Sequence, residues 1–105
     1  MRVRWSTPAR LDFRRHTRYI VADSPAAARQ ISARVREAVK ALATHPLMGR
    51  PGRVLDTREL VVPHTPFTIA YRVSSETVEI VGVLHQARQW PDRFDQGGEA
   101  DDSDM

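Results

Sequence analysis

Three side chains near the end of the sequence carry the functional groups that RNA cleavage without a metal ion requires. His85, Arg88 and Trp90 follow one another closely. Histidine serves as a general base or acid because its pKa lies near neutral pH. Arginine holds the negative charge that develops when the 2′-hydroxyl of RNA attacks its own phosphate. An aromatic ring stacks on a base that has left its helix. The residue types therefore suit a ribonuclease site.

Other basic side chains lie on the strands and loops before this group. For a ribonuclease, the catalytic candidates are His85, Arg88, Arg58 and Arg72. For a protein that only binds a target, the candidates are Arg50, Arg53, His64 and Trp90. The spacing of these residues alone does not choose between the two sets.

The same residues also have structural interpretations. A histidine such as His85, at the end of a buried strand, often only satisfies a hydrogen bond. Arg72 can pair with a nearby acid such as Glu79, and Trp90 before Pro91 can cover a core. These interpretations stay open beside the chemical ones.

Several other kinds of site are not indicated. The chain has no cysteine, which excludes disulfides and thiolate zinc ligands. Its four histidines lack the paired spacing of a metal site. We find no nucleophile motif, phosphate-binding glycine loop or carboxylate pair, so we expect no metal and no cofactor. No apolar run approaches the length of a membrane span, and we expect a cytoplasmic protein.

Charge is distributed unevenly along the 105 residues. The whole chain carries +3, but residues 95–105 hold five acidic residues and no basic one. Residues 1–94 therefore hold sixteen basic and eight acidic residues, a net charge of +8, and fifteen of the sixteen are arginine. Such a body suits nucleic acid or an acidic protein as a partner. A plain arginine-rich solvated surface explains the charge equally well.

Two helices and four strands are predicted to position these residues. Residues 2–6 alternate like a strand, and Thr7-Pro8 can cap a helix over about 8–22. Ser24-Pro25 repeats the start signal for a second helix, which ends before Pro46. The very short turn between them predicts an antiparallel helical hairpin. Apolar residues recur on one face of the second helix at Ala28, Ile31, Val35, Ala38 and Leu42.

The second half of the chain reads as a sheet. Strands are expected over 58–62, 67–73 and 77–84, after a loop rich in proline and glycine. The fold class is therefore α+β, with an N-terminal strand, a helical hairpin and a three-stranded antiparallel meander. The hairpin covers one face of the sheet, and the arginine-bearing face opposite is expected to form a concave working surface. We expect one domain over 1–94 and a disordered acidic tail over 95–105.

The order of these elements resembles the RelE/ParE toxin superfamily of type II toxin–antitoxin systems. The resemblance covers about residues 2–91. It is carried by Trp5, by Ser24-Pro25-Ala26-Ala27-Ala28, by His45-Pro46-Leu47-Met48-Gly49-Arg50-Pro51, by Arg58-Glu59-Leu60, by Tyr71-Arg72-Val73 and by Val78 to Gln86. It implies a toxin that arrests bacterial growth and is wrapped by a cognate antitoxin. Operator DNA would be met only through that antitoxin.

The resemblance leaves two targets open, because ParE-like members inhibit DNA gyrase and RelE-like members cut messenger RNA on the ribosome. Many RelE-like nucleases have an arginine where this chain has Thr68, and they often carry lysines in the loop, which has none here. The segment Val83-Leu84-His85-Gln86 looks more like ParE members. We therefore expect ParE-like gyrase inhibition. The alternatives are a metal-independent mRNA endonuclease and, more remotely, a non-toxic relative that binds nucleic acid.

Overall fold

The structure of the chain, a computed structural model, describes residues 1–87, 90–91 and 93–94. The catalytic candidate Arg88 and the predicted acidic tail over 95–105 lie outside these residues. The predicted α+β class is confirmed: a strand, two helices and then further strands follow one another along the chain. No helix in the described part of the chain is long and apolar enough to cross a membrane.

The two helices begin at residues that the sequence marks. Helix α1 spans Thr7–Asp23 and helix α2 spans Pro25–Thr44. Ser24 caps α2 as expected, since its side chain accepts a hydrogen bond from the Ala27 amide. The cap of α1 is Ser6 rather than Thr7, because the Ser6 hydroxyl accepts from the Ala9 amide. Helix α1 therefore begins one residue earlier than predicted.

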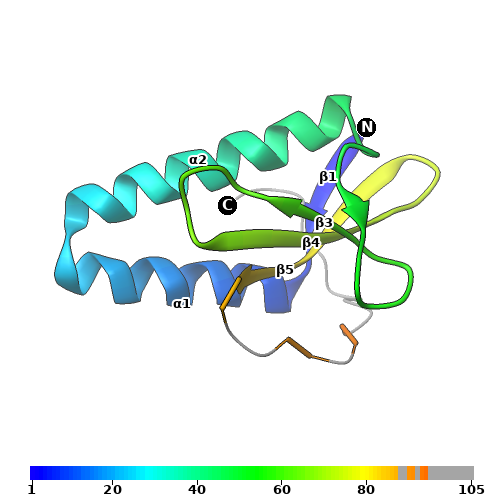
Figure 1. The fold of residues 1–105 in the computed structure, drawn as a ribbon. Coiled ribbons are helices and arrows are strands. Elements are labelled where there is room, and N and C mark those ends of the chain that lie inside the picture. The colour runs from blue at the N-terminus through cyan, green and yellow to red at the C-terminus, as the bar shows by residue number, and fades with distance from the viewer. Residues whose placement is uncertain (88–89, 92, 95–105) are drawn as a thin grey trace.

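Among the described residues the sheet holds five strands, one more than predicted (Figure 1). Their order is β1-β5-β4-β3-β2, and only the β1–β5 pair is parallel. The additional strand β2 is two residues long and pairs antiparallel with β3. Strand β5 lies inside the sheet between β1 and β4, which agrees with its apolar character on both faces. The strands are β1 Arg2–Trp5, β2 Arg50–Pro51, β3 Arg58–Val61, β4 Phe67–Val73 and β5 Thr77–His85.

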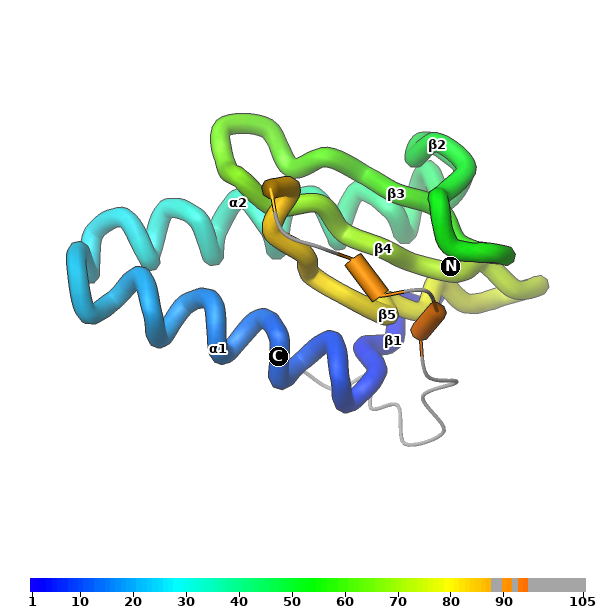
Figure 2. Tube along the Cα trace, turned by 60° about the horizontal axis from the view of Figure 1, so that its bottom comes forward, coloured from blue at the N-terminus to red at the C-terminus, as the bar shows by residue number. Residues whose placement is uncertain are grey.

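Both helices lie on one side of the sheet, and the core fills the space between the two layers (Figures 1 and 2). Trp5 stacks on Phe13 with ring centroids 5.5 Å apart. Alternate residues of β4, namely Phe67, Ile69 and Tyr71, point into this core. The intervening residues of β4 therefore point to the other face of the sheet.

That other face is partly covered, which differs from the free concave surface expected from the sequence. Figure 2 shows the segment with residues 90–91 and 93–94 (orange) passing over β4 and β5 on the side away from the helices. The Phe94 ring lies so close to Gly82 that a Cβ there would come within 2.9 Å of it. Thr68, on the same face near the start of β4, is only 2% exposed. The chain fills part of the face with its own aromatic residues, because Gly82 has no side chain and so leaves room for the Phe94 ring.

Candidate functional site

The loop between α2 and β3 is held against the sheet by Tyr71 and Arg58. The Tyr71 hydroxyl donates to the Pro46 carbonyl at 2.8 Å and accepts from the Gly49 amide at 2.9 Å. The Arg58 guanidinium donates to the carbonyls of Leu47 and Gly49. These contacts join the loop to strands β3 and β4, from which Arg58 and Tyr71 come.

Gly49 sits where no larger residue fits. A Cβ at this position would lie 2.6 Å from the Tyr71 hydroxyl and 2.7 Å from the Glu59 carbonyl oxygen. Both neighbours belong to the sheet, so neither can move aside cheaply. The loop therefore approaches the sheet through its glycine, and the next residue, Arg50, enters β2.

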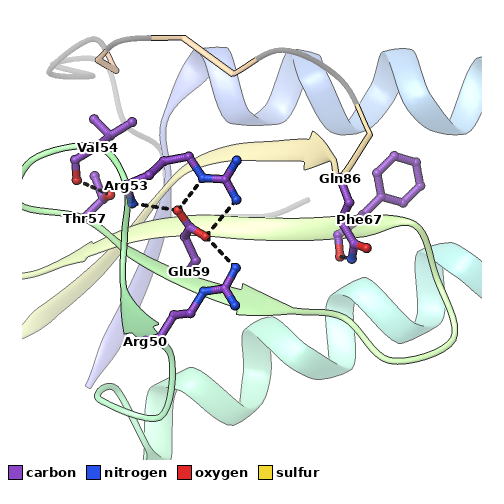
Figure 3. Close-up of polar contacts among 7 residues, drawn as sticks. All are labelled: Arg50, Arg53, Val54, Thr57, Glu59, Phe67 and Gln86. Carbon is purple, nitrogen blue, oxygen red and sulfur yellow. Dashed lines mark hydrogen bonds and ion pairs between the residues drawn. The ribbon is translucent and has the colours of Figure 1, made fainter.

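On the opposite side of β3, one buried carboxylate holds two arginines (Figure 3). The Glu59 side chain is 2% exposed, whereas those of Arg50 and Arg53 are 61% and 52% exposed. Arg50 donates to Glu59 Oε1 at 3.0 Å. Arg53 donates to Glu59 Oε2 through its backbone amide at 2.8 Å and its Nε at 3.1 Å, and to Oε1 at 3.4 Å. We call these three residues the Arg50–Glu59–Arg53 cluster.

The environment keeps Glu59 ionised. Burial by itself would raise the pKa of Glu59, but the hydrogen bonds from the Arg53 amide and from both guanidinium groups outweigh it and lower the pKa. The carboxylate is therefore charged at neutral pH, and the two arginines stay bound to it. Two positive charges against one negative charge leave an excess of +1 at the surface.

Trp90 contacts this cluster, and Arg72 has separate partners on the same face of the sheet. The Arg53 guanidinium lies over the Trp90 ring, 3.7 Å from its centroid. Arg72 lies opposite Glu79 on β5 and pairs with it at 3.9 Å, as one structural interpretation of the sequence proposed. Burial raises the pKa of Glu79, and Arg72 only partly opposes this effect. Arg72 also donates to the Phe94 carbonyl at 3.4 Å.

His85 lies at the other end of the sheet. Its Nδ1 accepts a hydrogen bond from the Ala87 amide at 3.1 Å, and its ring meets the edge of Phe67. Beside it, His16 of α1 packs on Phe67 and donates to the Val83 carbonyl at 2.8 Å. These contacts attach the C-terminal end of β5 to α1. Strand β1 pairs with β5 only as far as Ile80.

The described catalytic candidates do not meet in one place. His85 is paired with Phe67, whereas Arg58 is paired with Tyr71 and Arg72 follows one residue later. Four to five residues of strand β4 separate the two ends, about 13–17 Å at the usual rise per residue. Of the target-binding candidates, Arg50, Arg53 and Trp90 come together. His64 lies apart, exposed in the turn between β3 and β4 with a left-handed backbone (φ 62°).

Two residues that organise the site were not singled out from the sequence. Glu59 appeared only as a neighbour of Arg58, and Tyr71 only as a strand residue. An acid inside a strand and beside arginine is the signal that marks Glu59, since a buried carboxylate needs cations around it. Tyr71 carries no comparable signal, because its partners lie more than twenty residues away along the chain.

An apolar groove of about 340 Å³ runs between α2 and β3. Its walls include Ala38 and Ala41 of α2 and the half-exposed Met48 and Val61. The β2–β3 ladder ends at the pair Arg50 and Glu59, so no described strand pairs with the edge of β3 beyond that point. The groove thus combines apolar side chains with an open strand edge.

The fold and this surface define a small α+β protein with a basic cluster and an apolar groove. A family described as the ParE toxin of the type II toxin–antitoxin system parDE matches residues 3–90. The chain belongs to this family, within the RelE/ParE toxin superfamily, as the resemblance of its sequence motifs predicted.

Individual relatives agree with this assignment. The chain is 46% identical to "Putative toxin Y4kP" of Sinorhizobium fredii, over 86% of this chain and 93% of the relative. It is 34% identical to "Toxin RelE2" of Caulobacter vibrioides, over 80% and 93%. A solved structure of the chromosomal ParDE toxin–antitoxin system from P. aeruginosa is similar with a TM-score of 0.71 and 26% identity, covering 81% of this chain and 95% of that one.

Proposed function

We propose that this toxin arrests growth by binding DNA gyrase, without catalysing a reaction of its own. Membership of the ParE family supports a toxin with a cognate antitoxin. The choice of gyrase as the target goes further than family membership and depends on how the exposed side chains are arranged. A protein that only binds its target needs presented side chains, not a set of convergent acids and bases.

The observation that carries this proposal is the separation of His85 from Arg58 and Arg72. Acid–base catalysis requires groups within hydrogen-bond reach of one reacting phosphate. Here the described groups lie at two ends of the sheet and each has a partner within the protein. The buried Thr68 adds support, because many RelE-like nucleases have an arginine at that position.

The competing function is cleavage of messenger RNA, which His85 favours, because its ring is partly exposed at the end of β5. His85 and Arg88 would act on the RNA phosphate, and Trp90 would stack on an RNA base. In that case His85→Ala abolishes cutting in a translating extract while the fold survives.

Purified full-length protein added to gyrase and plasmid DNA tests the proposal. We expect supercoiling to stop and cleaved DNA linked to gyrase to accumulate. The double variant Arg50→Ala/Arg53→Ala should need a higher concentration for the same effect. Arg18→Ala/Arg29→Ala is the matched control, since it removes two exposed arginines from the helices. Unchanged supercoiling together with cut messenger RNA in a translating extract would replace this proposal with the ribonuclease.

We further propose that the groove between α2 and β3 receives the antitoxin. A segment that folds on binding can place apolar side chains against Ala38 and Ala41 and hydrogen-bond the open edge of β3. Ala41→Glu should weaken capture of the toxin by its co-expressed antitoxin while leaving gyrase inhibition intact. Equal capture of this variant and the wild type would exclude the groove.

A further inference from the structure

The Arg50–Glu59–Arg53 cluster has more hydrogen-bond donors than the protein uses. A guanidinium offers five N–H donors. Arg50 donates one to Glu59, and the Arg53 side chain donates two. No other acceptor among the described residues meets these guanidinium groups. Both side chains are more than half exposed, so the remaining donors are available to a ligand from solvent.

The two guanidinium groups are held close together and in fixed positions. Both donate to the same oxygen of Glu59, Oε1, at 3.0 and 3.4 Å, so one small oxyanion can accept from both. The Glu59 carboxylate is fixed in place, because it is buried and also accepts a hydrogen bond from the Arg53 backbone amide. Trp90 supports Arg53 from one side of the guanidinium plane. Free arginine side chains would lose considerable rotamer entropy on binding, and here the protein has already ordered them.

We propose that this cluster is a binding site for the phosphodiester backbone of nucleic acid. A phosphate presents non-bridging oxygens in several directions, which suits two guanidinium groups arranged around one point. Residues 1–94 carry +8, and this field attracts a polyanion more strongly than it attracts a single carboxylate. The contact reads no sequence, so it adds to any recognition of operator DNA by the antitoxin. It does not depend on gyrase as the target.

Fluorescence anisotropy with the full chain tests the proposal. Two labelled probes of matched length, a DNA duplex and a single-stranded RNA, separate the possible sources of the phosphodiester. We expect both to bind at low salt, with the affinity falling linearly on logarithmic axes as salt rises. In Arg50→Ala/Arg53→Ala the salt slope for duplex DNA should decrease by about 1 to 2, because each lost phosphate contact removes about 0.9. Arg18→Ala/Arg29→Ala loses the same formal charge and should keep a slope closer to the wild type.

Glu59→Gln distinguishes a built site from a merely positive surface. The substitution raises the net charge by one, so attraction by charge alone predicts tighter binding. If Glu59 positions the two arginines, the affinity should instead fall, by about five-fold, because the guanidinium groups are no longer held in place. A thermal melt of the same sample shows whether the variant is folded. Arg53→Lys serves as the second variant: it keeps the charge, loses the planar fork, and should also bind more weakly.

Three results would overturn the inference. The first is no binding of either probe at low salt. The second is equal or tighter binding by both Glu59→Gln and Arg53→Lys in their folded forms. The third is displacement of the probes by polyglutamate as effectively as by unlabelled nucleic acid at equal charge concentration. That last result would assign the surface to an acidic protein.

Discussion

The two sides of strand β3 use arginine in opposite ways. On one side, Arg58 turns toward the protein and donates to the carbonyls of Leu47 and Gly49. On the other side, the acid Glu59 is buried, and Arg50 and Arg53 surround it from the surface. Neighbouring residues of one strand point to opposite faces, so adjacent positions serve these two arrangements.

The comparison teaches that the buried partner decides what an arginine can do. Two neutral carbonyls of the protein's own loop accept from Arg58, both from its Nη1. A charged carboxylate anchors Arg50 and Arg53, and it uses only part of their donors, so the rest face solvent. The first arrangement stabilises the loop, and the second presents charge to a partner. Substitutions on the first side should therefore affect folding most, and those on the second side should affect binding most.

The largest effect on stability is expected at Gly49. Gly49→Ala places a Cβ against the Tyr71 hydroxyl and the Glu59 carbonyl, so the loop must move away from the sheet. The free energy of unfolding should fall by about 3 kcal/mol, the upper part of the usual range for overpacking. Urea denaturation followed by circular dichroism measures it. A loss below about 0.5 kcal/mol would mean that the loop is not closely held.

Removal of one hydroxyl should have the next largest effect. Tyr71→Phe keeps the ring in the core but leaves the Gly49 amide and the Pro46 carbonyl without their partner. The expected cost is about 2 kcal/mol, since a buried unsatisfied group costs about 1–3 kcal/mol. Tyr19→Phe on the exposed face of α1 is the control and should be neutral. Equal stabilities of the two variants would contradict the conclusion that the Tyr71 hydroxyl holds the loop against the sheet.

The two sides of β3 can be compared directly through their arginines. Arg58→Ala should cost about 1.5 kcal/mol, because it removes two hydrogen bonds from a charged donor to the loop. Arg50→Ala should cost less than about 1 kcal/mol, because the side chain is 61% exposed and Glu59 keeps Arg53. The same urea titrations measure both. A larger loss of stability in Arg50→Ala than in Arg58→Ala would contradict the distinction between the two sides of β3.

The smallest effect is the dependence of stability on pH. The pKa of Glu59 is lowered in the folded protein, so its contribution is present above the ordinary value of 4.5 and is lost as the pH falls through the folded pKa. The stability difference between wild type and Glu59→Gln should therefore shrink between pH 7 and pH 3. Burial raises the pKa of Asp12 and of Glu79, so these two groups change stability with pH in the opposite direction. Both groups are present in the wild type and in Glu59→Gln, so their effects cancel in the difference between the two proteins. If the stability difference between the two proteins stayed constant across this range, the pKa of Glu59 would not be lowered by folding.

The helices were predictable because their signals are local. Ser24-Pro25 and the apolar stripe of α2 lie within one element, and only the cap of α1 was misplaced, by one residue. Strand β2 was missed because two residues, one of them proline, carry no period. The covering of the outer face was missed for a different reason. It depends on Phe94 meeting Gly82, a contact that no local pattern encodes.

The candidate site was predicted in its residue types but not in its grouping. The sequence named Arg50, Arg53 and Trp90 as target-binding residues, and the structure brings these three together. It also named His85, Arg58 and Arg72 as one catalytic set, and the structure places them at two ends of the sheet. Strand register separates them, and register follows from pairing between distant segments.

The sequence by itself determined the α+β class, the helical hairpin, the interior position of strand β5 and the separation of a basic body from an acidic end. These properties follow from short-range periodicity, capping and composition. Tertiary structure alone decided that β1 pairs parallel to β5, that Arg58 serves the loop, and that Glu59 presents Arg50 and Arg53. The physical reason is that an arginine has the same charge everywhere in a sequence. Only its folded neighbours determine whether its donors are used within the protein or remain available to a partner.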